Sequence, residues 1–126
     1  MPDITTALIL FAHGSRDPEW VRPFEALRAS VSASAPGTQV VLAYLESSAP
    51  TLDDAIAALA RDGVISIRVL PLFLALGKHL RHDIPALARD VAAAFPGLVI
   101  EFMPALGEAP EFADALGRIA RRAVRA

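Results

Sequence analysis

Two histidines stand directly beyond long apolar runs of the sequence. His13 follows the run Ala7–Ala12, and His79 comes shortly after the run Ile65–Leu74. Imidazole nitrogens bind borderline divalent metals such as cobalt, nickel and iron, and a neutral histidine near pH 7 also accepts a proton. Glu46 follows a third apolar run and adds a carboxylate. Two imidazoles and one carboxylate leave coordination positions open, which favours transfer of a metal over a closed structural site.

Each of these residues also has an ordinary structural explanation. A single histidine after a buried strand more often makes a capping or hydrogen-bonding contact, and it is the joint placement of His13 and His79 that favours a site. Glu46 is equally compatible with capping the next helix or facing solvent. His82, three residues beyond His79, is a potential third ligand, but its position near a helix start favours a solvent-facing side chain, so we place it outside the site.

Basic residues flank the two histidines. Arg16, Lys78 and Arg81 could neutralise an acidic substrate, and ordinary solvated charge is an equally good explanation for them. A second basic cluster lies near the C-terminus, where cations complement the dipole of a helix; it comprises Arg118, Arg121, Arg122 and Arg125.

Several enzyme classes lack their required signature in this sequence. There is no GxGxxG, GxxxxGK[ST] or GxSxG motif, which argues against dinucleotide binding, P-loop chemistry and a serine nucleophile elbow. A histidine phosphatase would need arginine before His13, where Ala12 stands. The chain has no cysteine, so thiolate chemistry and disulfides are excluded, and its net charge of −2 is a poor match for nucleic acid.

Four apolar, branched runs predict buried strands, and a segment with helical spacing follows each of them. The predicted strands are Ala7–Ala12, Gln39–Leu45, Ile65–Leu74 and Leu98–Met103. The helical segments carry apolar residues every three or four positions, as in Trp20, Phe24, Leu27 and Val31 of the first and Phe112, Leu116, Ile119 and Ala123 of the last. Pro71 lies inside a predicted strand and predicts an irregularity there.

This alternation predicts an α/β fold: a three-layer domain with a four-stranded parallel sheet in the order 2-1-3-4 and helices on both faces. Ligands of such sheets bind beyond the carboxyl ends of the strands, at the switch point, which lies here between the first and third strands. His13 and His79 therefore reach the same crevice. Gly14 and Gly77 beside them permit tight turns and close approach of the backbone.

Length and composition predict one domain over residues 1–126. Hydrophobic residues make up 54% of the 126 residues and aromatic residues 6%, so Ala, Val, Leu and Ile must fill the core. The early apolar run is too short for a signal peptide, and the longest later run cannot span a bilayer. We therefore predict a soluble, cytoplasmic protein without membrane or nucleic-acid partners.

At these residues the sequence resembles the small CbiX-type sirohydrochlorin chelatases of the class II tetrapyrrole chelatase superfamily. The resemblance covers nearly the whole chain and rests on three segments in order: Ala12-His13-Gly14-Ser15-Arg16, Leu45-Glu46-Ser47-Ser48-Ala49-Pro50-Thr51-Leu52, and Leu70-Pro71-Leu72-Phe73-Leu74 through Gly77-Lys78-His79 with Asp83-Ile84-Pro85 following.

The resemblance implies a lyase that inserts cobalt, iron or nickel into sirohydrochlorin in cobalamin or sirohaem-type biosynthesis. His13 and His79 would be metal ligands and bases, Glu46 the acidic helper, and the divalent metal a substrate rather than a tightly bound cofactor. Sirohydrochlorin carries many carboxylates, so Arg16, Lys78 and Arg81 become candidates for substrate contact.

The resemblance also implies a homodimer. Longer class II enzymes hold the macrocycle between two lobes, and this chain supplies one, so two copies would face a shared cleft with C2 symmetry. A noncatalytic carrier of metal or tetrapyrrole using the same cleft is the alternative function. The physiological metal and the pathway stay open. The affinity of such a site for divalent metals follows a general series, and the metal that is bound depends on its availability in the cell.

Overall fold

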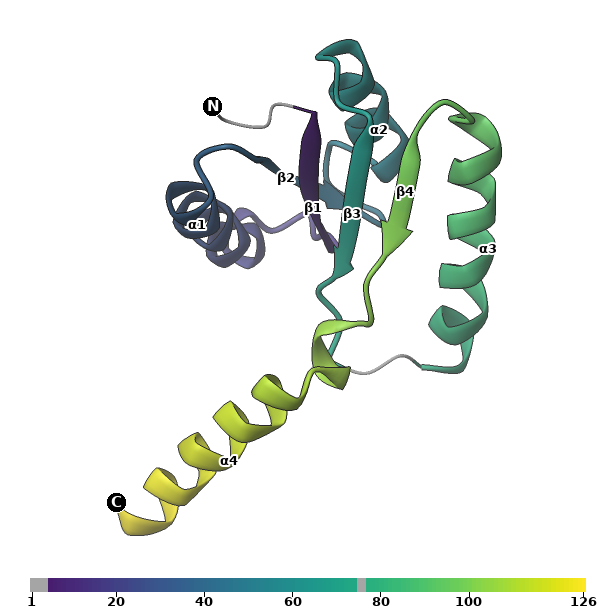
Figure 1. Ribbon diagram of the computed structural model, residues 1–126. Helices are drawn as coiled ribbons and strands as arrows, with labels where there is room; N and C mark the ends of the chain where they lie inside the picture. Colours follow the sequence, from purple (N-terminus) through teal and green to yellow (C-terminus); the bar gives the residue numbers. More distant parts are fainter. Residues whose placement is uncertain (1–4, 75–76) are drawn as a thin grey trace.

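The computed structural model describes residues 5–74 and 77–126, the side chains of Lys78 and His79 excepted. Its strands form one parallel sheet in the order β2-β1-β3-β4, which confirms the predicted topology (Figure 1). The strands are β1 (Thr6–Ala12), β2 (Gln39–Tyr44), β3 (Ser66–Pro71) and β4 (Val99–Phe102). The helices are α1 (Pro18–Ser34), α2 (Leu52–Arg61), α3 (Lys78–Ala94), the short 3₁₀ helix η1 (Leu106–Glu108) and α4 (Pro110–Arg125).

Capping side chains set where the first two helices begin. The Asp17 carboxylate accepts the backbone N–H of Glu19 at the start of α1, and the Thr51 hydroxyl accepts that of Asp54 at the start of α2. Each contact satisfies one of the free N–H groups of a first helical turn. Because Thr51 occupies the N-cap position of α2, Glu46 has no capping role there.

The third strand is shorter than the sequence predicts. It ends at Pro71, where the expected strand continued to Leu74. Proline has no N–H to give to the ladder, although the next residue, Leu72, still donates its N–H to the Phe11 carbonyl at 2.8 Å. Beyond Leu72 the chain leaves the sheet and reaches η1, where the Phe73 carbonyl accepts the Gly107 N–H at 2.9 Å.

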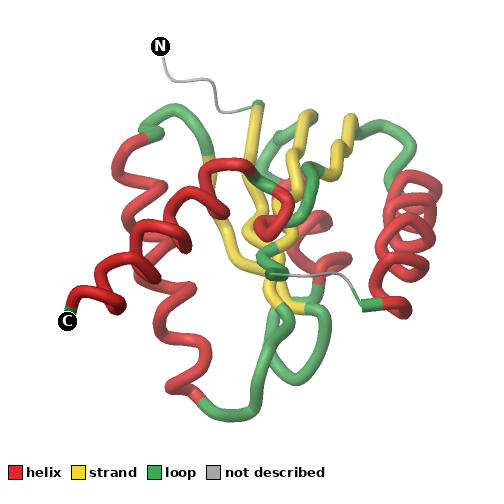
Figure 2. Tube along the Cα trace, turned by 90° about the horizontal axis from the view of Figure 1, so that it is seen from below, coloured by secondary structure: helices red, strands yellow, loops and turns green. Residues whose placement is uncertain are grey.

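Helices α2 and α3 cover one face of the sheet, and α1 covers the other (Figures 1 and 2). The larger core cluster lies under α2 and α3 and includes Ile9, Phe11, Ile56, Ile67, Val69 and Val91, all at most 1% exposed. The smaller cluster lies under α1 and includes Leu10, Ala12, Val40, Tyr44 and Leu72. These two clusters hold the carboxyl ends of β1, β2 and β3 in fixed register.

Helix α4 leaves the domain at the carboxyl edge of the sheet (Figure 1). Its closest neighbour is η1 at its own start, and none of its described residues is buried. Leu116 and Ile119, two of the predicted apolar positions, are 50% and 53% exposed. The helix was predicted correctly from its spacing, but none of the residues of its apolar stripe is buried against the described part of the chain.

Candidate functional site

Backbone hydrogen bonds extend the pairing of β1 and β2 beyond the two strands. Leu45 N–H donates to the Ala12 carbonyl at 2.9 Å, and Glu46 N–H donates to the His13 carbonyl at 3.0 Å. Both loops therefore run side by side for one more residue. This extension brings His13 and Glu46 together, as their positions after adjacent strands predict.

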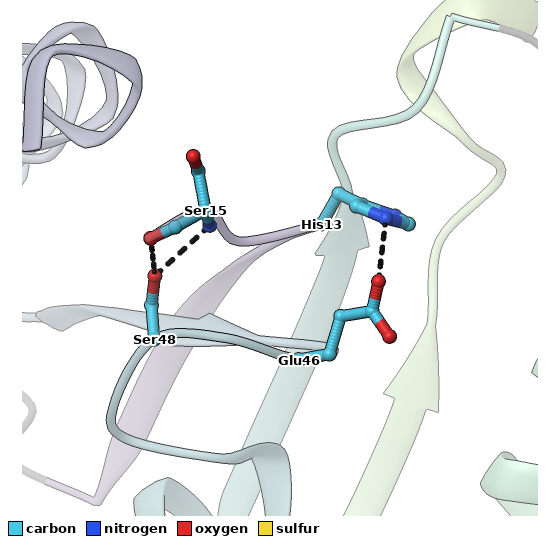
Figure 3. Close-up of polar contacts among 4 residues, drawn as sticks. All are labelled: His13, Ser15, Glu46 and Ser48. Carbon is cyan, nitrogen blue, oxygen red and sulfur yellow. Dashed lines mark hydrogen bonds and ion pairs between the residues drawn. The ribbon is translucent and has the colours of Figure 1, made fainter. Parts of the chain in front are cut away.

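The side chains of His13 and Glu46 are in contact (Figure 3). His13 Nε2 lies 3.0 Å from Glu46 Oε1, and the two side chains are 58% and 63% exposed. A carboxylate can only accept at this contact, so in the neutral imidazole Nε2 carries the proton and Nδ1 keeps a lone pair. That lone pair is available for a metal ion or a proton, and a carboxylate on the other nitrogen fixes the tautomer and the orientation of the ring.

Phe73 supports the imidazole from a second direction. Its ring centroid lies 6.4 Å from that of His13 with an interplanar angle of 81°, an edge-on arrangement. Phe73 itself is 7% exposed and packs edge-on against Phe11, 5.9 Å away between centroids. The buried aromatic pair thus anchors an otherwise exposed histidine to the core.

Gly14 allows the close approach of the two loops. Its φ is 96°, in the left-handed region, and a Cβ built there would lie 1.8 Å from the Glu46 carbonyl oxygen. Only glycine fits both requirements. Gly77 differs, because its φ of −63° is open to any residue and a Cβ there would meet nothing within 4 Å, so the role predicted for this glycine is not required by the fold.

Ser48 fastens the loop after β2 to the loop after β1 (Figure 3). Its hydroxyl accepts the Ser15 N–H at 3.0 Å and donates to the Ser15 carbonyl at 2.7 Å. Between Glu46 and Ser48, Ser47 adopts a φ of 64°, which few residues other than glycine adopt without support from their surroundings. Ser48 and Phe73 are the residues that sequence reasoning missed as parts of the site; the Ser47-Ser48 pair beside Glu46 was the available signal.

A cavity of about 310 Å³ opens beside His13, and we call it the His13 pocket. It lies between α1 and the carboxyl ends of β1, β2 and β3 and is lined by His13, Gly14, Ser15, Trp20, Val21, Phe24, Tyr44 and Leu72. Burial raises the pKa of the Tyr44 phenol above its usual value, and the Glu25 carboxylate raises it further. Tyr44 is therefore a neutral hydroxyl at physiological pH in a largely apolar pocket.

The structure describes the other predicted site residues to different extents. The backbone of His79 lies in the first turn of α3, the helix that follows β3 in the sequence, and its side chain, like that of Lys78, lies outside the described residues. Arg81 is exposed in the same first turn, and Arg16 is exposed in the loop that follows His13. His82 is exposed on α3, in agreement with the solvent-facing position predicted for it.

Within the described part of the chain, no group of three or more His, Asp or Glu side chains is arranged to hold a metal ion. His13 and Glu46 supply two candidate ligand side chains at the carboxyl edge of β1 and β2. The other predicted metal ligand, His79, lies in the first turn of α3, the helix that follows β3, and β3 pairs directly with β1.

A family model described as CbiX matches residues 7–123 of the sequence. The chain belongs to the CbiX family. Among its relatives, this CbiX protein is 35% identical over 79 residues to the sirohydrochlorin cobaltochelatase of Methanopyrus kandleri, a match that covers 63% of this chain and 55% of the relative. It is 37% identical over 84 residues to the sirohydrochlorin cobaltochelatase of Saccharolobus solfataricus, covering 64% and 61%. The chain thus spans less than two thirds of the length of these relatives.

Solved structures confirm the fold of this CbiX protein. A CbiX protein from Marinobacter aquaeolei VT8 superposes with a TM-score of 0.83 at 32% identity and covers 95% of this chain and 98% of that one. The sirohydrochlorin chelatase SirB from Bacillus subtilis subspecies spizizenii, solved in complex with cobalt, gives a TM-score of 0.77 at 26% identity. That match covers 94% of this chain but 50% of SirB.

Proposed function

We propose that this CbiX protein inserts a divalent metal ion, cobalt or alternatively iron or nickel, into sirohydrochlorin. The contact between His13 and Glu46 at the mouth of the His13 pocket carries the proposal, because it pairs a potential ligand and base with a carboxylate. The names of the relatives and the cobalt in the SirB structure support it independently.

Metal insertion requires two proton removals for each ion delivered. A divalent cation replaces the two pyrrole N–H protons at the centre of the macrocycle, so the charge of the macrocycle–metal unit is unchanged and two protons leave. His13 Nδ1 would hold the incoming ion or accept one of these protons. Glu46 would hold the imidazole in orientation through its contact with Nε2, and we assign the matching role of ligand and base to His79.

Basic residues would meet the substrate carboxylates. Arg16 lies exposed in the loop beyond His13, and Arg81 in the first turn of α3 beyond β3. Together with Lys78 they would surround an acidic macrocycle with positive charge. They would contribute to substrate capture rather than to metal binding, since cations repel the incoming ion.

We further propose that the chain is one lobe of a two-lobed site and functions as a homodimer. The match to half of SirB supports this arrangement. A pocket of about 310 Å³ is at the lower end of the 300–1,000 Å³ usual for drug-sized ligands, so one copy encloses only part of a tetrapyrrole.

We also propose that the protein is cytoplasmic, because the metal ion and the water-soluble macrocycle would both be available there. No helix in the described part of the chain has the length and apolar character needed to cross a membrane.

Turnover tests the proposal against the alternative of a carrier. The purified protein is mixed with an excess of sirohydrochlorin and cobalt(II), and the absorption change of metallation is followed in time. An enzyme converts many equivalents per site at a rate well above that of the protein-free mixture. Conversion that stops at one equivalent per site would support the carrier and overturn the chelatase.

A further inference from the structure

The loop that carries Phe73 is held by a residue from a distant part of the chain. Gly107, in η1, donates its N–H to the Phe73 carbonyl at 2.9 Å. Its backbone also lies close to the next residue, because a Cβ built on Gly107 would overlap the Leu74 carbonyl oxygen and come within 2.9 Å of the Leu74 Cα. The φ of Gly107 is not positive, so this close approach alone requires glycine. We call the contact of Gly107 with residues 73–74 the η1 clasp.

The turn η1 is itself firmly attached to the domain. It lies at the carboxyl edge of the sheet, beyond β3 and β4 (Figure 1). Met103 N–H donates to the Val69 carbonyl at 2.8 Å and continues the pairing of β3 with β4 toward η1. Ala105 is buried, and Leu106 packs against the smaller core cluster, which includes Leu72. The η1 clasp therefore joins the loop after β3 to a fixed part of the fold.

The segment held by the η1 clasp has left the sheet. Strand β3 ends at Pro71, and the last ladder contact beyond it is the hydrogen bond from Leu72 N–H to the Phe11 carbonyl. Leu74 is 66% exposed, so the peptide between Phe73 and Leu74 has space on one side into which it can move. Packing against Phe11 holds the Phe73 ring, and the η1 clasp holds the backbone that carries this ring.

The orientation of His13 depends in turn on Phe73. The contact between His13 and Glu46 joins two side chains that are more than half exposed, and an exposed pair of this kind contributes little on its own. The buried Phe73 ring, edge-on to the imidazole, is the support that the core provides. If Phe73 moved, His13 would keep only Glu46, and its ring would be free to turn.

We propose that Gly107 is a positioning residue of the metal-insertion site: through the η1 clasp it keeps Phe73 edge-on to His13 and so sets the direction of the imidazole nitrogens. The inference rests on the proposed function, in which His13 meets the metal ion or a proton. Phe73 and Gly107 are not among the described residues that line the His13 pocket, so their effect falls on the reacting group rather than on substrate binding. Gly107→Ala would place a methyl group where the Leu74 carbonyl lies and would displace Phe73 with it.

The imidazole signals of the protein without metal or macrocycle test this role directly. The chain has three histidines, and His13→Ala identifies the C–H signals of His13 in ¹H–¹³C spectra. Phe73→Leu removes the aromatic ring and shows how far, and in which direction, this ring displaces the His13 signals. Gly107→Ala should move the His13 signals in the same direction as Phe73→Leu, while the signals of His82, exposed on α3, stay in place. A folded Gly107→Ala protein with unchanged His13 signals overturns the inference.

Gly97→Ala is the matched control. Gly97 lies just before β4, at the opposite end of that strand from Gly107, and a Cβ there would meet nothing within 4 Å. The same added methyl group should therefore leave the His13 signals unchanged. Equal displacements in the two glycine variants would be a general effect of the substitution and would overturn the role of the η1 clasp.

Hydrogen exchange of the unaltered protein gives a result that does not depend on whether Gly107→Ala folds. The Gly107 amide should exchange slowly, as should the Met103 amide that is bonded to Val69, because exchange requires the hydrogen bond to open. A Gly107 amide that exchanges as fast as an amide of an unstructured chain overturns the η1 clasp, and with it the inference.

Turnover measurements separate this inference from the proposed function. Gly107→Ala and Phe73→Leu should each lower kcat by about ten- to a hundredfold with little change in KM, because a small misplacement of a reacting group slows the chemistry while the pocket stays intact. The double variant should be no slower than the slower single one, since both act through the same ring. Additive losses, or a change confined to KM, would overturn the positioning role.

The two proposals fail in different ways. An unaltered protein without turnover, whose His13 signals nevertheless move in Gly107→Ala, would contradict the proposed function alone. Turnover by the unaltered protein together with unchanged His13 signals in Gly107→Ala would contradict this inference alone.

Discussion

The interior beneath α2 and the loops at the carboxyl edge of the same sheet differ in what holds them in place. Under α2, apolar side chains such as Ile56 are fully buried and fixed by packing. At the edge, His13 and Glu46 are more than half exposed, and backbone hydrogen bonds together with the Ser48 hydroxyl position them. Stability and chemistry therefore reside in different residues, and changes in one region should leave the other largely intact.

The largest expected effect on stability comes from the interior. Ile56→Ala should lower the free energy of unfolding by about 2–5 kcal/mol, because it removes buried methyl groups and leaves a cavity. Ile65→Ala is the matched control, since Ile65 is 56% exposed and should change the free energy by well under half as much. Urea denaturation measures both. Equal losses for the two variants would contradict the division between packed interior and exposed edge.

For His13→Ala, at the carboxyl edge of the sheet, we expect a large loss of activity and a small loss of stability. Chelatase activity should fall by at least about a hundredfold, the scale of a lost acid–base group or ligand, while the free energy of unfolding changes little. His79→Ala should behave alike, and the double variant should be hardly worse than the poorer single one, because groups acting on the same ion are not additive. His82→Ala serves as the control. Mild and additive losses would assign both histidines structural roles.

A smaller effect is expected from the hydroxyl that joins the two loops. Ser48→Ala removes two hydrogen bonds, each of which contributes about 0.5–1.5 kcal/mol, and should reduce activity by about tenfold through misplaced Glu46. Ser48→Thr keeps the hydroxyl and should restore most of the activity. Ser15→Ala is the control, because Ser48 contacts only the backbone of Ser15. Equal activity of Ser48→Ala and Ser15→Ala would remove Ser48 from the positioning of the site.

The smallest effect concerns the basic residues around the edge. Replacing Arg16, Lys78 or Arg81 by Ala should raise KM several-fold with little change in kcat, and more at low than at high salt, because screening weakens exposed charges. Arg61→Ala is the control, since Arg61 ends α2 at the opposite edge of the sheet. Steady-state assays at two ionic strengths decide the question. A KM that none of the three substitutions changes would return these residues to ordinary surface charge.

Local patterns in the sequence were sufficient to predict the strands, the helices and the order of the strands in the sheet. Apolar runs and helical spacing predicted all four strands and the helices between them, because burial against water acts on each segment in the same periodic way. The order 2-1-3-4 followed from the right-handed crossover, and the proximity of His13 to Glu46 followed from parallel strands ending at one edge. The end of β3 at Pro71 was misjudged by three residues, since its apolar character continues to Leu74 where its pairing does not.

Other features of the molecule depend on the tertiary structure and could not be predicted from local patterns. Helices α2 and α4 show the same kind of apolar period, yet α2 buries Leu52, Ala55, Ile56 and Leu59, whereas no described residue of α4 is buried. A helical period predicts that one side of the helix packs against an apolar surface, but it does not identify that surface. The contact between Ser48 and Ser15 joins residues 33 positions apart, and the support of His13 by Phe73 depends on where β3 leaves the sheet. Sequence therefore determined the chemistry available at each position, and the packing of distant segments decided which side chains meet, because contact depends on distances that no local pattern encodes.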